Sequence, residues 1–168
     1  LSDGLDFTKI EAGELVLTPQ PVDLHGLVQE LTAVHQEIAS NSGLNFIAEY
    51  SNLTRDPVLC DKSRLTQVLN NLLNNASKFT KKGHISFTVT SNRQRDNSLA
   101  VHVVVEDTGI GIPPEQIEEI FTPFKQLRPP ADSINSGSGL GLAISSRLVD
   151  LMDGELTVNS AVGQGTTY

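Results

Sequence analysis

Residues 61–80 read DKSRLTQVLNNLLNNASKFT, and the apolar residues among them recur with the period of an amphipathic helix. The apolar stripe consists of Leu65, Val68, Leu69, Leu72, Leu73 and Ala76. A second, polar stripe runs along one edge of it at helical spacing and consists of Gln67, Asn71, Asn75 and Lys78. The spacing therefore predicts one helix whose buried face is bordered by a row of polar side chains.

Four asparagines lie in this segment, although asparagine is a poor helix former. The spacing directs Asn70 and Asn74 towards solvent and places Asn71 and Asn75 at the border between core and solvent. An amide oxygen at such a border can ligate Mg²⁺, which prefers oxygen and keeps several of its waters. Taken alone, the segment is better explained by surface amides, so the interpretation depends on the rest of the chain.

Composition narrows the class of protein. The chain has 168 residues, of which 38% are hydrophobic and 19% charged, as expected for one globular domain. The net charge of −8 argues against a nucleic-acid partner, since such proteins more often present a basic face. The single cysteine, Cys60, allows no internal disulfide and is expected in the core. No run is long enough to span a membrane, and the chain starts without Met, so we expect a piece of a longer protein.

The flanking sequence predicts further helices and strands. A helix is expected at residues 24–42, with Asp23 as its N-cap, and shorter helices at residues 1–12, 114–120 and 140–152. The apolar face of the helix at residues 24–42 is expected to contain Leu24, Leu27, Val28, Leu31, Val34, His35 and Ile38. Strands are expected at residues 14–22 (an edge strand), 44–50, 58–60, 84–91, 99–106, 155–160 and from 166. The predicted fold class is α/β, a two-layer sandwich of a mixed, mostly antiparallel sheet of about five strands on three helices.

Glycines gather in three clusters in the second half of the chain. Gly137, Gly139 and Gly141 come directly before an expected helix, where backbone N–H groups can bind an anion. Their spacing matches neither a P-loop nor a dinucleotide fingerprint, and a flexible hinge explains them about as well.

Asp107 ends a hydrophobic strand and is followed by Gly109 and Gly111. Its carboxylate could accept a hydrogen bond from an exocyclic amine such as that of adenine, with the glycines leaving room for a flat base. The alternative is an aspartate that caps a turn, a common position for this residue.

Together, these clusters resemble the ATP-binding domain of sensor histidine kinases, within the superfamily shared with gyrase B, ATP-dependent chaperones and mismatch-repair ATPases. NLLNNASKFT (71–80) is similar to the N box, DTGIGIP (107–113) and GSGLGLAI (137–144) to the two glycine boxes, IFTPFKQ (120–126) to the F box, and GQGTTY (163–168) to the last motif. LDFTKIEAG (5–13) resembles the end of the second dimerisation-domain helix. The resemblance divides the chain into residues 1–12, the end of that helix, and residues 13–168, the ATP-binding domain.

The resemblance implies roles for individual residues, with ATP and Mg²⁺ as cofactors. Asn75 takes the position of the Mg²⁺ ligand, Lys78 should reach the phosphates, and Asn71 lies where gyrase-type enzymes place a glutamate base. Asp107 should bind the adenine amine, and the mobile stretch 125–136 becomes the ATP lid. The catalytic set is therefore Asn71, Asn75 and Lys78. The other nucleotide-contacting residues are Asp107, Gly109, Gly111, Ile112, Phe121, Phe124, Gly137, Gly139, Leu140, Gly141 and Thr166.

The resemblance also implies partners. None of the four histidines, His25, His35, His84 and His102, stands in the context of the family's phosphoacceptor motif. We therefore expect the acceptor on a separate dimerisation and histidine phosphotransfer domain, a response-regulator receiver domain as the next partner, a monomeric fragment and a homodimeric parent. The expected location is a cytoplasmic domain of a parent in the inner membrane. Two alternatives are a nucleotide-sensing module without kinase activity and a gyrase-type ATPase, against which the Asn at position 71 argues.

Overall fold

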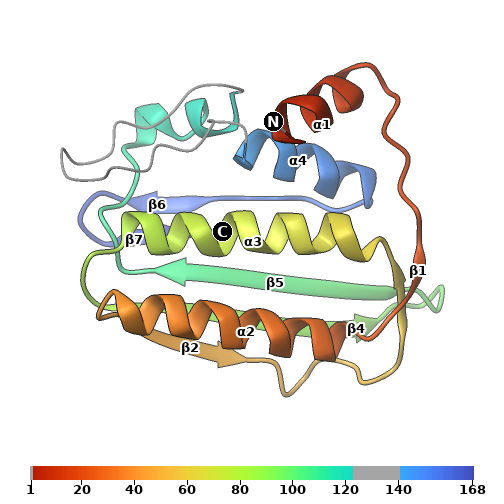
Figure 1. Cartoon of the computed structure of the whole chain (residues 1–168), viewed down its shortest axis with the longest axis horizontal. Coiled ribbons are helices and arrows are strands. Elements are labelled where there is room, and N and C mark those ends of the chain that lie inside the picture. Colours follow the sequence, from red (N-terminus) through yellow and green to blue (C-terminus); the bar gives the residue numbers. More distant parts are fainter. Residues whose placement is uncertain (1, 123–140) are drawn as a thin grey trace.

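Three helices, α2 (Leu24–Asn41), α3 (Lys62–Phe79) and α4 (Gly141–Leu151), lie across one face of a β-sheet (Figure 1). The computed structural model describes residues 2–122 and 141–168. The order of the five-stranded sheet is β2 (Asn45–Glu49), β4 (His84–Arg93), β5 (Leu99–Asp107), β7 (Gly165–Thr167) and β6 (Asn159–Ala161). The β2–β4 pair is parallel, and the other neighbours are antiparallel. This mixed sheet under three helices confirms the predicted fold class.

Smaller elements surround this sandwich. β1 (Gln20–Val22) and β3 (Val58–Cys60) form a separate antiparallel pair beside it. α1 (Ser2–Glu11) lies against α4, where Arg147 Nε approaches Glu11 Oε1 to 3.6 Å (Figure 1). Two 3₁₀ turns, η1 (Pro114–Gln116) and η2 (Glu119–Phe121), follow β5. Within the described residues, none of the helices combines the length and apolar character needed to cross a bilayer.

The two long helices begin where the sequence predicts. Asp61 caps α3 by accepting a hydrogen bond from Arg64 N at 3.2 Å, and Asp23 caps α2 through Gly26 N at 3.0 Å. These side chains satisfy N–H groups that have no partner within the helix. The predicted apolar stripe of α3 is buried at Val68, Leu69, Leu72, Leu73 and Ala76.

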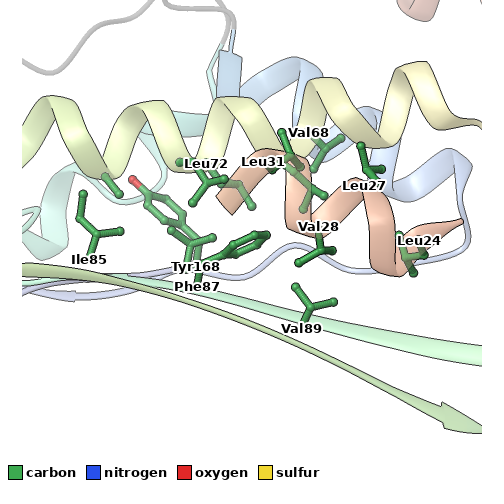
Figure 2. Close-up of a cluster of buried hydrophobic side chains, with 14 of the residues drawn as sticks. Leu24, Leu27, Val28, Leu31, Val68, Leu72, Ile85, Phe87, Val89 and Tyr168 are labelled. Carbon is green, nitrogen blue, oxygen red and sulfur yellow. The ribbon is translucent and has the colours of Figure 1, made fainter. Parts of the chain in front are cut away.

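The core lies between the helices and the sheet. Ile85, Phe87 and Val89 alternate along β4 and are 0–1% exposed, because every second residue of a strand faces the same side. Figure 2 shows these side chains meeting those of α2 and α3, with Tyr168 among them. The core thus holds both the helix that carries the asparagines and the strands that lead to Asp107.

Several sequence predictions about elements are wrong in extent. The edge strand expected at residues 14–22 is only β1, and the strand expected at 155–160 is only β6. The helix expected at residues 114–120 is replaced by η1 and η2. Prolines lie in two of these segments, where the fixed φ and the missing N–H shorten regular structure. The alternation of apolar residues does not show where such short strands begin and end, because they form few hydrogen bonds with their neighbours.

Two predictions about helix faces are also wrong. Val34 and Ile38 of α2 are 53% and 39% exposed, and the buried face instead includes Ala39. Asn70, expected towards solvent, is half-buried, and its Oδ1 accepts a 2.9 Å hydrogen bond from Nε2 of the buried His35. His35 therefore has a structural role, because its hydrogen bond links α2 to α3 in the core.

Candidate functional site

The end of α3, the loop after β5 and the β6–β7 hairpin meet in one place. Ile110 N donates to Phe79 O at the end of α3, at 3.2 Å, and Ile110 O accepts from Gly163 N of the hairpin at 2.9 Å. Thr166 pairs with Asp107 in the sheet register. Two of the sequence clusters, 107–113 and 163–168, and the C-terminal end of the 71–80 cluster are therefore brought together by backbone hydrogen bonds.

Asp107 is the buried acid of this site, with 4% of its surface exposed. Its Oδ1 accepts hydrogen bonds from Gly109 N at 2.9 Å and from Thr166 N at 3.2 Å. Burial raises the pKa of Asp107, and these two hydrogen bonds together with the Thr80 side chain partly offset the effect. Because both amides use Oδ1, neither of them occupies Oδ2. The backbone thus holds the carboxylate through Oδ1 and leaves acceptor capacity on Oδ2.

Ser160 of β6 is a site residue that sequence reasoning missed. Its hydroxyl accepts a hydrogen bond from Ile112 N at 2.7 Å, donates to Gly165 O at 2.9 Å and lies 2.8 Å from Thr166 Oγ1. It therefore joins the Asp107 loop to the hairpin that carries Thr166. A lone serine in a short strand gives no signal in sequence, because its partners are set by sheet pairing.

The glycines after Asp107 are required by close packing. A Cβ at Gly109 would lie 2.2 Å from Phe79 O, and one at Gly111 would lie 2.1 Å from Ala161 O. Gly111 also has a φ of +74°, which side chains rarely adopt. These contacts give a structural reason for both glycines. Their predicted place beside a base stays a prediction.

The polar stripe of α3 reaches α4. Asn71 Nδ2 donates to Gly141 O at 3.2 Å and to Ser145 Oγ at 3.0 Å. Asn75, one turn further along α3, is half-buried at the predicted border of the core. The structure therefore brings Asn71 together with the first described residue of the second glycine cluster.

Lys78 continues this stripe and is half-buried. Burial lowers the pKa of its ammonium group. Its Nζ lies 5.4 Å from the centroid of the Phe79 ring, within range of a cation–π contact. A partly desolvated cation next to Asn75 is suited to interact with an anion.

The donor set fits Mg²⁺ only together with a ligand. In residues 2–122 and 141–168, no three His, Cys, Asp or Glu side chains gather into a metal cluster. Mg²⁺ commonly binds through one or two protein oxygens together with phosphates and waters. The half-buried amide of Asn75 could supply such an oxygen, so its position is compatible with a metal brought in by a nucleotide.

Some predicted site residues lie outside the described part of the chain. These are Phe124, Gly137, Gly139, Leu140 and the expected lid at residues 125–136. Phe121 closes η2 and is half-buried, and Ile112 is buried at 3% exposure. The described part of the site therefore consists of the α3 stripe, the Asp107 loop, the hairpin and the start of α4.

A known protein family matches the part of the chain that contains the site. Residues 60–168, more than half of the chain, match the family described as "Histidine kinase-, DNA gyrase B-, and HSP90-like ATPase". The chain belongs to this ATPase family. This confirms the resemblance found in the sequence motifs.

Two relatives of the chain are bacterial sensor proteins. The chain is 37% identical over its whole length to the autoinducer 2 sensor kinase/phosphatase LuxQ of Vibrio parahaemolyticus, and covers 20% of that protein. It is 41% identical over 99% of its length to the virulence sensor protein BvgS of Bordetella bronchiseptica, and covers 14% of it. It thus spans a fifth or less of these two relatives.

Solved structures agree with the family fold. Full-length ShkA in complex with AMPPNP superposes with a TM-score of 0.80 and 34% identity, over 99% of this chain and 33% of that one. The catalytic domain of the histidine kinase ThkA superposes with a TM-score of 0.68 and 27% identity, over 91% of this chain and 94% of that one. The chain is therefore of the ATP-binding catalytic type found in protein-histidine kinases, as predicted.

Proposed function

We propose that this chain binds ATP·Mg²⁺ as the catalytic domain of a two-component sensor histidine kinase. It would direct the γ-phosphate to a histidine on the parent's dimerisation domain, for onward transfer to a response-regulator aspartate. The observation that carries this proposal is the buried Asp107 carboxylate, whose Oδ1 is held by two backbone amides. The loop that follows Asp107 contacts the C-terminal end of α3, a helix lined by half-buried polar groups. One site thus combines a hydrogen-bond acceptor for the amine of a base with a row of polar side chains that can bind an anion.

Each residue contributes through its position. The Asp107 carboxylate accepts a hydrogen bond from the amine of the base, and Lys78 offers positive charge to the phosphates. Thr166 N holds the Asp107 carboxylate, and Ser160 holds the loop that follows it. Asn75 would hold the metal ion, which when bound supplies charge neutralisation for the transferred group. The role of the chain's own residues is thus to bind and orient, which accounts for much of the catalysis of phosphoryl transfer.

The proposal includes the parent protein. Residues 1–12, which contain α1, are the end of the second dimerisation helix, and residues 13–168 are the ATP-binding domain. The partners are the parent's dimerisation and histidine phosphotransfer domain and a receiver domain. The parent is a homodimer in the inner membrane with this domain in the cytoplasm, and the isolated chain is a monomer.

A titration with AMPPNP, with and without Mg²⁺, tests the proposal. We expect adenine-selective binding that Mg²⁺ strengthens, with a guanine nucleotide as the control ligand. Asn75→Ala should weaken the Mg²⁺-dependent part by at least several-fold. The matched control is Asn74→Ala, because Asn74 neighbours Asn75 but is exposed. Equal AMPPNP affinities for Asn75→Ala and the parent chain would contradict the metal role, and no binding by the parent would overturn the proposal.

The residue at position 71 bears on whether the chain transfers the phosphate to a protein or hydrolyses ATP. Its amide is a poor base, which favours transfer to a protein over attack by water. Asn71→Glu should therefore introduce steady ATP hydrolysis, measured as phosphate release. No change in hydrolysis would count against placing Asn71 at the base position of gyrase-type enzymes.

A further inference from the structure

Ser145 is a buried polar residue for which the proposed function has no use so far. It is 0% exposed and lies on α4 among the buried residues Ala143, Ile144 and Leu148. Serine is a weak helix former, and a buried hydroxyl needs a partner. Alanine would fill nearly the same space without a polar atom. The choice of serine at this position therefore calls for an explanation from its contacts.

The partner of Ser145 is Asn71 of α3. Asn71 Nδ2 donates to Ser145 Oγ at 3.0 Å and to Gly141 O at 3.2 Å. Gly141 and Ser145 are four residues apart, on one face of α4. A single carboxamide thus bridges the first turn of α4 to the middle of α3.

This geometry fixes which way the carboxamide points. A backbone carbonyl accepts hydrogen bonds and cannot donate them, so the group facing Gly141 O must be the NH₂ of Asn71. Both of its N–H bonds are then used by α4. The carbonyl oxygen of Asn71 is left as the acceptor for a group outside α4. Asn75 follows one turn later on the same stripe.

We propose that Ser145 is a positioning residue of the nucleotide site. It orients the Asn71 amide and sets the first turn of α4 against α3, and both of these line the phosphate side of the site. The inference rests on the proposed function, since it assigns the phosphates to that side. Ser145 itself touches no ligand and acts through Asn71.

Ser145→Ala removes the hydroxyl while nearly preserving the packing. We expect the affinity for AMPPNP·Mg²⁺ to fall about three- to tenfold, the size of one hydrogen bond. The affinity for adenosine should stay the same, because adenosine lacks phosphates and uses the distant Asp107 end. Ser146→Ala, at the next position on the same helix and half-buried, is the matched control and should bind both ligands like the parent.

A double-mutant cycle separates positioning from general stability. If Ser145 acts through Asn71, the double variant Asn71→Ala, Ser145→Ala binds AMPPNP·Mg²⁺ like Asn71→Ala alone. Losses that multiply would overturn the inference. So would a Ser145→Ala variant that has a lower melting temperature and an unchanged ratio of AMPPNP·Mg²⁺ to adenosine affinity.

A nucleotide-free measurement distinguishes this inference from the proposed function. The side-chain ¹⁵N–¹H signals of Asn71, assigned by their loss in Asn71→Ala, should shift and exchange faster in Ser145→Ala. Unchanged signals would show that the Asn71–Ser145 hydrogen bond does not orient the amide. If this hydrogen bond is present but the parent binds no AMPPNP, the proposed function fails, and the positioning role fails with it. If the parent binds and Ser145→Ala binds equally well, only the positioning role fails.

Discussion

At the scale of single residues, the Asp107 carboxylate is both buried and hydrogen-bonded, and burial is the larger influence on its pKa. Burial raises its pKa above that of an ordinary aspartate, near 4. In the proposed role the ionised carboxylate accepts a hydrogen bond from the adenine amine, so protonation should weaken adenine binding. Adenosine affinity should therefore fall between neutral pH and pH about 4, beginning at a higher pH than an ordinary aspartate would give.

The measurement is an adenosine titration by NMR at several pH values. Asp107→Asn is the control, because it lacks the ionisation and should bind more weakly with no matching pH step. Affinity that is constant down to the range of an ordinary aspartate would contradict the role of the ionised carboxylate.

Gly111 and Gly163 form a matched pair of residues. Both have positive φ, +74° and +81°, but a Cβ at Gly163 would meet nothing within 4 Å, whereas one at Gly111 would lie 2.1 Å from Ala161 O. Gly163→Ala should cost about 1–2 kcal/mol for its backbone conformation alone. Gly111→Ala should cost more, because the backbone of β6 must also move. Denaturant unfolding of the two variants checks this order, and equal losses would show that the contact relaxes freely.

At the scale of elements, Asp61 joins the start of α3 to the segment before β1. It accepts from Arg64 N as the N-cap, and its Oδ2 accepts from Thr18 N at 2.9 Å and from the Thr18 hydroxyl at 3.2 Å. Asp61→Ala should reduce the free energy of unfolding by about 1–2 kcal/mol. The control is Asp23→Ala, whose cap bond is exposed and which should cost less.

The pH dependence of this contribution has a defined sign. Burial opposes ionisation of Asp61, but the hydrogen bonds from Thr18 and Arg64 lower its pKa below the ordinary value. Its stabilising contribution is therefore complete above pH about 4 and is lost as the pH falls through the lower folded pKa. Urea unfolding at a series of acid pH values should show the parent converging on Asp61→Ala. A difference that persists at the lowest pH would contradict the assignment.

Elements with strong local signals were predictable, and their partners were not. The α3 stripe and both N-caps follow from spacing and capping chemistry within a few residues of chain. The link from Asn70 to His35, the Ser160–Ile112 bond and the Asn71–Ser145 bond join residues at least 35 positions apart. Their existence depends on the packing angle of the helices and on the sheet register, which no local pattern encodes.

At the scale of the whole molecule, the proposed nucleotide site lies at the edge of the same core that stabilises the fold. The core cluster draws side chains from α2, α3, α4, β4 and β5, and Tyr168 lies within it. Burial first, and then the nearby charge of Asp107, raise the pKa of the Tyr168 hydroxyl. The site and the core therefore draw on the same elements, α3, α4 and β5, and we expect the described sandwich to unfold as one unit.

Two isoleucines on adjacent strands test this single core. Ile85 of β4 is 0% exposed, whereas Ile47 of the edge strand β2 is 54% exposed. Ile85→Ala should lower the free energy of unfolding by about 2–5 kcal/mol, since it leaves a cavity. Ile47→Ala should change it by about 0.5 kcal/mol or less, as is usual for surface positions. Urea unfolding followed by circular dichroism and by tyrosine fluorescence should give coincident transitions for the parent and both variants. Two separate transitions, or equal losses for the two isoleucines, would show that the helices and the sheet do not share one cooperative core.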